Sequence, residues 1–389
     1  MRWFDVASTM SAEPVFDYAV IGAGIAGASV AFRLSLGGRN RVLVLEREVQ
    51  PGYHSTGRSA AMFIESYGTA TIRALTRASR AFCERPPEGF AEHSLLTPRG
   101  VLHVAGEGQQ DLLESAWRDL ARDAPDVRRV HPGEALALVP VLRASGLCGA
   151  ILERDAQDID VHALHQGYLR GLRSCGGVLR TGAEQMGAER VGDLWVIALA
   201  DGHTVRARTV VNAAGAWADV VAAFCGARPV GLEPRRRSAF TFAAPDGMDC
   251  ARWPAVVGID EGFYFKPDAG HLLGSPANAD PVSPHDVMPE ELDIALGIHR
   301  IQEATTLVVH RPRHAWAGLR SFVRDGEFVL GWDDGRDGFF WLAAQGGYGI
   351  QTAAAAAELA AALLRGEPVP DALARQGVDP SVMAPARLR

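Results

Sequence analysis

Apolar segments and glycine-rich turns alternate over the first fifty residues. Residues 16–21 (FDYAVI) are typical of a buried strand, and a glycine-rich turn follows them. An apolar-periodic segment then continues to Leu36 and stops at Gly37-Gly38, as expected for a helix with a C-terminal signal. Arg41–Leu45 (RVLVL) predicts a second strand. Together these segments predict a β-α-β unit and a parallel sheet.

The rest of the chain changes its pattern twice. Helical periodicity is expected in Thr71–Cys83, Asp111–Arg122, Val161–Arg173 and the alanine-rich Ala353–Leu364. Buried strands are expected at Thr209–Val211 and Phe339–Ala343, each running into a glycine-containing segment. From Leu232 to about Val309, short β-like segments are separated by Pro and Gly, which is typical of a mostly antiparallel sheet.

These two kinds of pattern predict two domains in one α/β chain. Parallel-sheet signals lie at both ends and near 205–215, so the nucleotide-binding domain is expected to be discontinuous. We assign 15–85, 145–225 and 316–375 to it, and 86–144 and 226–315 to an inserted α+β substrate domain built on a mostly antiparallel sheet. Residues 1–14 form an N-terminal extension.

Composition excludes several classes of function. Of 389 residues, 48% are hydrophobic and 22% charged, as in globular proteins. The formal net charge of −7 argues against nucleic acid or an anionic membrane as a partner. No segment approaches the roughly 18 uncharged apolar residues of a transmembrane helix. Residues 1–14 lack a continuous apolar segment, so we expect no secretory signal and a cytoplasmic location, with peripheral attachment to an inner membrane left open.

Cysteine and histidine give no sign of a metal. The five cysteines are scattered and form no C-x-x-C pair, which argues against a disulfide framework and a zinc site. The histidines show no metal-ligand spacing, so no metal is expected.

A dinucleotide fingerprint occupies the first turn. Gly22-x-Gly24-x-x-Gly27 follows a strand and opens a helix. Gly22 permits the tight turn, Gly24 lets the backbone approach a pyrophosphate, and Gly27 permits close packing of the helix on the sheet. The helix N-terminus then favours the negative charge of the pyrophosphate. Glu46, at the tip of the second strand, can accept hydrogen bonds from ribose hydroxyls.

Longer segments resemble the D-amino acid oxidase superfamily of flavoproteins, with the closest likeness to bacterial FAD-dependent D-arginine dehydrogenases. They include YAVIGAGIAGASVAFRL (18–34), PGYHSTGRSAA (51–61), VNAAGAW (211–217) and AAQGGYGIQT (343–352). The likeness extends from about residue 16 to the C-terminus. It implies a Rossmann-like, glutathione-reductase-type FAD-binding domain. Some sarcosine oxidase-like relatives attach FAD to a cysteine in the last third of the chain, whereas the last cysteine here is Cys250, so we expect non-covalent FAD.

The resemblance assigns a set of residues to the cofactor. Backbone groups of Gly346 to Gln351 would pass the flavin, where a following helix N-terminus stabilises the charge of its reduced form. The full set is Gly22, Gly24, Ala26, Gly27, Glu46, Arg47, Ser55, Thr56, Gly57, Arg58, Ser59, Ala60, Ala61, Met62, Gly215, Gly346, Gly347, Tyr348, Gly349, Ile350 and Gln351.

The resemblance also implies a substrate clamp. Arg237 and Arg320 match carboxylate-binding positions, and the guanidinium fork suits a carboxylate. Tyr264 and Tyr67 match phenols that complete the clamp, and Gly347 joins the catalytic set. The implied reaction is hydride transfer from Cα of a D-amino acid to flavin N5, giving a 2-oxo acid. No dedicated base is evident, so the rate is expected to depend on orientation and to rise with pH as the amine loses its proton.

The side-chain pocket departs from the D-arginine pattern. Val101 stands where those enzymes have an acid for the guanidinium, and the other pocket positions are Met62, Ile64, Ala255 and Val257. A buried guanidinium without a counter-charge is costly, so we expect neutral or apolar side chains to be preferred. Glu65 is a possible substitute acid and leaves D-arginine or D-lysine as an alternative.

A dehydrogenase is expected rather than an oxidase. Some sarcosine oxidase-like relatives place a lysine over the flavin, whereas the matching strand here reads GHLLGS (270–275), and the single lysine is Lys266. The expected acceptor is a quinone or a respiratory chain. Other readings are a secondary-amine oxidoreductase acting on sarcosine or proline, a 2-hydroxy-acid oxidoreductase, and a flavin-carrying subunit without catalysis. The oligomeric state stays open.

Overall fold

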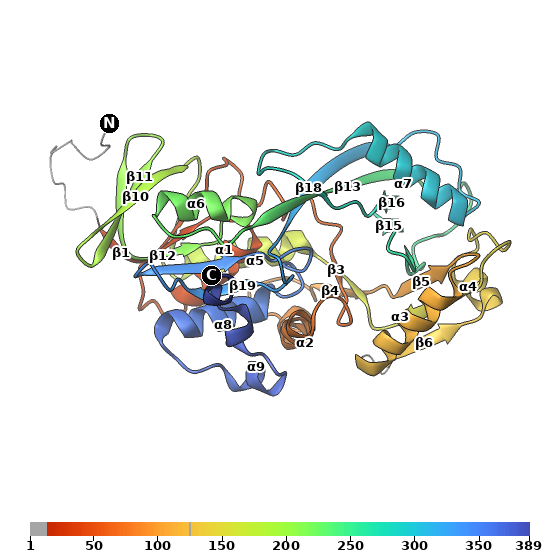
Figure 1. The fold of residues 1–389 in the computed structure, drawn as a ribbon, viewed down its shortest axis with the longest axis horizontal. Helices are drawn as coiled ribbons and strands as arrows, with labels where there is room; N and C mark the ends of the chain where they lie inside the picture. The colour runs from red at the N-terminus through yellow and green to blue at the C-terminus, as the bar shows by residue number, and fades with distance from the viewer. Residues whose placement is uncertain (1–13, 124–125) are drawn as a thin grey trace.

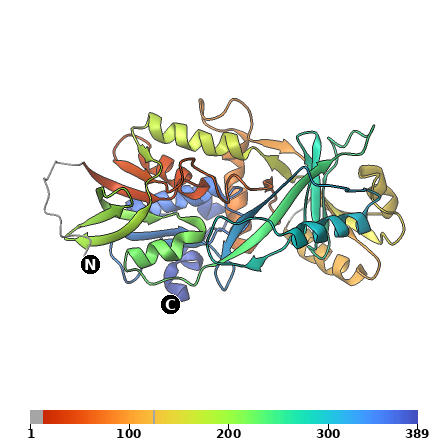
Figure 2. The same cartoon turned by 90° about the horizontal axis from the view of Figure 1, so that it is seen from above.

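The computed structural model describes residues 14–123 and 126–389 and arranges them in two lobes (Figures 1 and 2). One lobe is built on an eight-stranded sheet and the other on a nine-stranded sheet. The expected extension, residues 1–14, lies outside the described residues apart from Pro14.

The eight-stranded sheet has a parallel centre made from both ends and the middle of the chain. Its strands run in the order β20 (Phe339–Ala343), β12 (Thr204–Asn212), β1 (Val15–Ile21), β2 (Val42–Leu45) and β9 (Val178–Arg180). The hairpin of β10 (Gln185–Val191) and β11 (Leu194–Leu199) adds antiparallel to β12, and β19 (Val329–Trp332) adds antiparallel to β20. The parallel sheet predicted from the sequence is therefore present, and it combines strands from distant parts of the chain.

Small side chains pack the helices of this lobe closely. In α8 (Ala353–Arg365), ten of thirteen residues are buried, and the helix contacts both α1 (Ile25–Ser35) and α2 (Ala70–Glu84). It ends at Gly366, which adopts a left-handed conformation with φ +68°. The remaining helices here are α5 (Val161–Ser174), α6 (Ala218–Phe224), α9 (Asp371–Arg375), and the 3₁₀ turns η1 (Gly215–Trp217), η2 (Pro380–Met383) and η3 (Pro385–Leu388).

The nine-stranded sheet is antiparallel except for one pair, as its sequence pattern predicts. Its order is β17 (Asp280–Pro281), β13 (Glu233–Ala243), β16 (His271–Ser275), β15 (Tyr264–Asp268), β14 (Ala255–Gly258), β5 (Val101–Ala105), β7 (Gly149–Glu153) and β6 (Val127–Val130), with β18 (His314–Phe322) also on β13. Only β14 and β5 run parallel. The helices of this lobe are α3 (Gln110–Asp123), α4 (Pro132–Leu138) and α7 (Glu291–Ala304).

Strand pairing divides the chain differently from the expected domain limits at two places. β7 pairs with β5 and β6 of the nine-stranded sheet, although it follows the expected boundary at 145. β18 pairs along β13, although the boundary at 316 falls within it. Both strands are antiparallel partners, and their pairing depends on distant residues. The helix α7 lies where the sequence suggested only β-like segments.

Two further features connect the lobes. The long strands β13 and β18 run from one lobe toward the other (Figure 1). A small sheet of β3 (Met62–Phe63), β8 (Gln157–Ile159) and β4 (Leu96–Pro98) lies between them. Among the described residues, no helix is long and apolar enough to cross a lipid bilayer.

Candidate functional site

A cavity of about 250 Å³ lies where the parallel strands end. Gly22 follows β1, Glu46 follows β2, Ala213 follows β12 and Ala344 follows β20, and all four residues line the cavity. Ligands of open parallel sheets bind outside the carboxyl ends of the strands.

The glycine-rich turn has no room for side chains. Gly22 has φ +98°, and a Cβ there would lie 2.6 Å from the carbonyl oxygen of Ala213. A Cβ on Gly27 would collide with the carbonyl of Gly22, so α1 can pack on the turn only with glycine at this position. Gly22 and Gly24 line the cavity, and Gly27 lies behind them. Bare backbone is thus presented to the ligand, as expected from the fingerprint.

Two polar side chains hold this turn in place. The Glu46 carboxylate accepts hydrogen bonds from the backbone N–H groups of Ala23 at 2.7 Å and Glu48 at 2.9 Å. Thr56 Oγ1 accepts from Ile25 N at 3.0 Å, at the start of α1. Each Glu46 oxygen keeps a lone pair for a ligand hydroxyl, because a carboxylate oxygen can accept twice.

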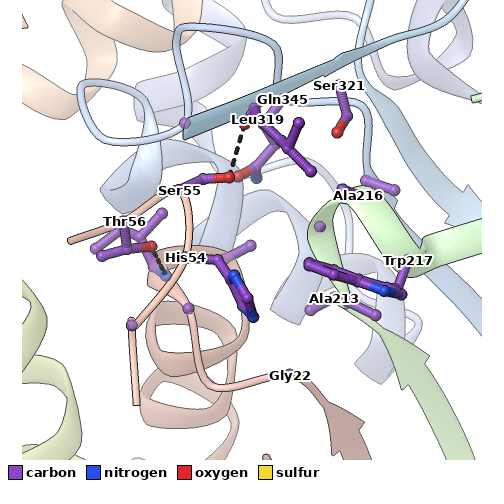
Figure 3. Close-up of a pocket in the computed structure, with 18 of the residues that line it drawn as sticks. Gly22, His54, Ser55, Thr56, Ala213, Ala216, Trp217, Leu319, Ser321 and Gln345 are labelled. Atoms are coloured by element: carbon purple, nitrogen blue, oxygen red, sulfur yellow. Dashed lines mark hydrogen bonds between the residues drawn. The ribbon is translucent and has the colours of Figure 1, made fainter. Parts of the chain in front are cut away.

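A loop that contains residues 55–60 belongs to the lobe with the eight-stranded sheet, which we call the nucleotide lobe. This loop reaches the strand β18 on the opposite wall of the cavity. Ser55 Oγ donates to the carbonyl of Leu319 at 2.6 Å (Figure 3). Arg58 donates to the carbonyl oxygens of Val287 at 2.9 Å and Ala317 at 3.1 Å. Ser55, Thr56, Arg58, Ser59 and Ala60 all line the cavity, so this glycine- and serine-rich loop forms one wall, as its sequence suggested.

An aromatic wall and the side-chain carbonyl of Gln185 complete the end of the cavity near the first glycine-rich turn. The Arg47 guanidinium carbon lies 4.4 Å from the centroid of the Trp217 ring. The centroids of the His54 and Trp217 rings are 4.6 Å apart (Figure 3). His54 Nε2 is 2.8 Å from Glu48 Oε1. Gln185 lines the cavity, and its buried Oε1 has no hydrogen-bond partner among the residues that the structure describes. An orphaned acceptor at a cavity wall is suited to a ligand donor such as the amino group of an adenine.

Sequence reasoning missed the roles of Trp217, His54 and Gln185 in lining the cavity. Trp217 ends the segment VNAAGAW, where its position after a small-residue turn was the available signal. Gln185 stands at the start of β10, within no motif.

The other end of the cavity is cationic. Arg237, Tyr264 and Arg320 line it, and the Tyr67 hydroxyl lies 3.4 Å from Arg320 Nη1. β13 and β18 pair so that Arg237 lies opposite Gly318, which places both guanidiniums on one sheet face. Burial, and then the positive charge of Arg320, lower the pKa of Arg237. Both groups remain charged near neutral pH, so the site attracts an anion.

The three arginines in series on β13 have different roles. Arg236 points away from the cavity into a carboxylate cluster, where its Nε donates to Asp293 at 2.9 Å. Arg237 donates from Nε to the carbonyl of Asn278 at 2.6 Å, which fixes its guanidinium. Arg235 pairs with Glu233 on the same strand. The alternation predicted from strand geometry is therefore present.

A second glycine-rich turn, after β20, packs against this cationic end. A Cβ on Gly347 would lie 2.9 Å from the Arg320 guanidinium carbon, and one on Gly346, with φ +51°, would lie 2.6 Å from the Phe322 ring. Gly346, Gly347, Gly349 and Ile350 line the cavity. The Tyr67 and Tyr348 rings are 4.8 Å apart, and burial raises the pKa of Tyr348 to about 12.

Several expected site residues lie outside the cavity lining. Gln351 donates to the Ile64 carbonyl and accepts from the Ile64 N–H, both at 3.2 Å, and bonds Thr76 Oγ1 at 2.9 Å. It therefore anchors a neighbouring segment. The others outside the lining are Gly27, Gly57, Ala61, Met62, Ile64, Tyr67, Val101, Ala255, Val257 and Tyr348. Ala26, Arg47 and Gly215 are part of the lining.

The five pocket positions form one apolar cluster. Met62, Ile64 and Val257 pack against buried Val101 and Ala255. Glu65, considered as a substitute acid for this pocket, pairs instead with Arg80 at 2.5 Å. Lys266 pairs with Asp158 at 2.6 Å and does not line the cavity. Among residues 14–123 and 126–389, no three His, Cys, Asp or Glu side chains are grouped to bind a metal ion.

Comparison with known families gives a match over most of the chain. The model of the family described as "DAO: FAD dependent oxidoreductase" matches residues 17–363. A 4-methylaminobutanoate oxidase (formaldehyde-forming) of Paenarthrobacter nicotinovorans is 30% identical over 257 residues, covering 65% of this chain and 31% of that protein. Human mitochondrial dimethylglycine dehydrogenase is 22% identical over 284 residues, covering 71% and 31%. The chain thus spans about a third of these relatives' length.

Solved structures share the fold over nearly the whole chain. Glycine oxidase from Geobacillus kaustophilus superposes with a TM-score of 0.82 at 22% identity, covering 96% of this chain and 98% of that one. L-Proline dehydrogenase from P. horikoshii superposes with a TM-score of 0.80 at 20% identity, covering 96% and 97%. None of these four proteins is a D-arginine dehydrogenase, so that likeness stays an expectation from sequence.

Proposed function

The chain belongs to the DAO family of FAD-dependent oxidoreductases, and on this basis we propose that it is a D-amino acid dehydrogenase that prefers neutral or apolar side chains. FAD is its cofactor, and its donors are amines. The products would be a 2-oxo acid and ammonia, released when water hydrolyses the imine formed at Cα.

The observation that carries this proposal is the pair of half-buried guanidiniums, Arg237 and Arg320, at one end of the cavity. Two neighbouring cations favour a ligand with a carboxylate, and the forks can bind it bidentately. The phenols of Tyr264 and Tyr67 lie beside them and can donate to the same carboxylate. A carboxylate fixed at its two oxygens orients the adjacent Cα, and such orientation lowers the barrier without a dedicated base.

The cofactor end of the cavity suits FAD. The backbone of Gly22 and Gly24, together with Glu46, would hold the pyrophosphate and ribose, and Gln185 would meet the adenine. The turn at Gly346 and Gly347 would back the flavin. FAD, when bound, supplies the acceptor for the two electrons that leave the substrate.

The preference for neutral side chains rests on the apolar cluster around Val101 and Ala255, which lies outside the cavity lining and adjoins it through the strand pair of Val257 and Tyr264. Glu65 is held by Arg80, so it offers no free charge to a substrate guanidinium. A cationic side chain would lose its hydration here without gaining a partner. The D configuration is proposed from the sequence resemblance.

A dehydrogenase is proposed because Lys266, the chain's one lysine, is bonded to Asp158 and lies outside the cavity lining. An ammonium beside the flavin would favour reaction with oxygen, whereas this ammonium is neutralised by a carboxylate. The electron acceptor would be a quinone or a respiratory chain.

A second candidate is the oxidation of a small secondary amine such as sarcosine. The names of the relatives favour it, because they include a dimethylglycine dehydrogenase and a 4-methylaminobutanoate oxidase. The same clamp would hold the carboxylate, and the apolar cluster would face a substrate without a side chain.

Anaerobic reduction of the FAD-loaded protein distinguishes these candidates. D-leucine, D-methionine, L-leucine, D-arginine, sarcosine and D-lactate would each be mixed with it, and the loss of oxidised-flavin absorbance followed. The proposal predicts the fastest reduction by neutral D-amino acids. Fastest reduction by sarcosine favours the second candidate, and reduction by neither class contradicts both.

A further inference from the structure

We propose that Glu153 is a positioning residue that restricts the substrate to compact side chains, because it holds the segment 62–67 against the nine-stranded sheet. The inference rests on the proposed function, since it concerns the side chain of the same amino-acid substrate.

One face of the nine-stranded sheet connects the cationic end of the cavity with Glu153. Tyr264 pairs with Val257, Val257 pairs with His103, and Val101 pairs with both Ala255 and Glu153. Paired residues of neighbouring strands lie on the same face. The opposite face carries a separate apolar core that includes Leu102, Val256 and Phe265. Glu153 therefore lies on the same sheet face as Tyr264 and Val101, on the strand next to that of Val101.

Glu153 is a buried carboxylate held by two donors from different parts of the chain. Its Oε2 accepts from Ser66 Oγ at 2.5 Å, and its Oε1 accepts from His103 Nε2 at 2.7 Å. The Glu153 side chain is 7% exposed. No Arg or Lys ion pair to Glu153 occurs among the described residues, so these two bonds carry its stabilisation. Hydrogen bonds to a charged group are stronger than neutral ones, at about 1.5–3 kcal/mol.

The segment 62–67 is held by hydrogen bonds at two positions, Ser66 and Ile64. Four residues after Met62, Ser66 is bonded to the sheet, and Ile64 between them is bonded through its backbone to Gln351. Held in this way, Met62 and Ile64 pack against Val101, Ala255 and Val257.

The packing leaves little room for a substrate side chain. Val101 is 0% exposed and Ala255 is 2% exposed beneath the segment. A bulky side chain directed along this face must lift Met62 and Ile64, and lifting the segment stretches the bond between Ser66 and Glu153. Compact side chains, as in glycine and D-alanine, avoid this cost.

The test compares substrate size preference in four variants, with an artificial dye as electron acceptor. Ser66→Ala and Glu153→Ala each remove the hydrogen bond between Ser66 and Glu153. Glu153→Gln is the conservative variant, since its amide can accept from Ser66 and donate to a His103 tautomer. Glu114→Ala removes an exposed carboxylate of the same lobe that is paired with Arg129, and serves as the control. The readout is kcat/KM for D-phenylalanine divided by kcat/KM for D-alanine, because a uniform loss of activity cancels in this ratio.

The wild-type protein and Glu114→Ala are expected to favour D-alanine, with Glu153→Gln close to them. Ser66→Ala and Glu153→Ala are expected to raise the ratio about tenfold, the scale of discrimination by pocket volume, mainly through a lower KM for D-phenylalanine. Ser66→Ala removes one partly exposed hydroxyl, so it keeps the test valid if Glu153→Ala fails to fold. An unchanged ratio in Ser66→Ala with full FAD content overturns the inference.

A wild-type protein reduced by no amino acid would instead overturn the proposed function. The claim that Glu153 holds the segment 62–67 against the sheet is then tested by hydrogen exchange. Faster exchange of the amides of Ile64 and Tyr67 in Ser66→Ala is expected, and unchanged exchange contradicts the role of Glu153.

Discussion

Gly347 is in contact with Arg320, so that a Cβ added at Gly347 would lie 2.9 Å from the guanidinium carbon. Only glycine at this position leaves the guanidinium where it faces the cavity. The position of Arg320 thus depends on two segments, the strand β18 and the turn after β20.

Gly347→Ala should displace the Arg320 side chain and weaken substrate binding. The loss of one charge-assisted contact predicts a fall in kcat/KM of roughly tenfold to a hundredfold, mostly as a higher KM. Steady-state kinetics with D-alanine measures it. Gly335→Ala is the control, since its nearest neighbour would lie at 3.7 Å. Unaltered kinetics of Gly347→Ala would show that Arg320 does not bind the substrate.

Arg237→Lys keeps the charge and removes the fork. Bidentate contact with a carboxylate is lost, so KM should rise by about tenfold or more while FAD binding is retained. Arg235→Lys, two residues earlier on the same strand, should leave KM unchanged, because Arg235 pairs with Glu233 at 2.6 Å. Equal effects of the two substitutions would contradict the assignment of Arg237.

Lys266→Met tests whether Lys266 promotes the reaction of the reduced flavin with oxygen. Arg99 still pairs with Asp158 at 2.6 Å, so this carboxylate keeps a partner. The reduced protein should react slowly with oxygen in the wild type and at the same rate in Lys266→Met. Stopped-flow reoxidation in air-saturated buffer measures this. Fast reoxidation in the wild type, lost in the variant, would identify an oxidase that uses Lys266.

Alkaline stability should depend on Cys225. Burial raises the pKa of its thiol from 9.0 to about 12. The unfolded thiol therefore ionises first, so stability is complete below about pH 9 and is lost as the pH rises toward 12. Each pH unit in that window should lower the free energy of unfolding by about 1.4 kcal/mol for this group. Cys225→Ala should show a shallower decline in denaturant titrations across that range, whatever its absolute stability. Identical slopes would contradict the shift.

Local patterns made much of the nucleotide lobe predictable. β1, α1 and β2 follow one another in sequence, and their apolar periodicity and glycine stops carry the information. The helix α7 was not recognised, because Leu292 and Leu296 are 75% and 37% exposed and interrupt the amphipathic pattern. The pairing of β7 and β18 with the other lobe depends on partners that are far apart in sequence.

In the candidate site, too, residues within a local motif could be predicted from the sequence, whereas contacts between distant segments could not. The fingerprint glycines could be assigned because backbone geometry dictates their type. Gln351 was expected at the flavin but bonds Ile64, and Glu153 was not singled out at all. Its place opposite Val101 follows from strand register, which pairs residues 52 positions apart.

Single-turnover product analysis under anaerobic conditions tests the central claim most directly. The FAD-loaded protein would be mixed with excess D-alanine and quenched after the flavin is reduced, and pyruvate and ammonia would be quantified. The account predicts one equivalent of each per flavin reduced, and neither product from L-alanine. Flavin that stays oxidised with D-alanine, or reduction without a 2-oxo acid, would contradict it.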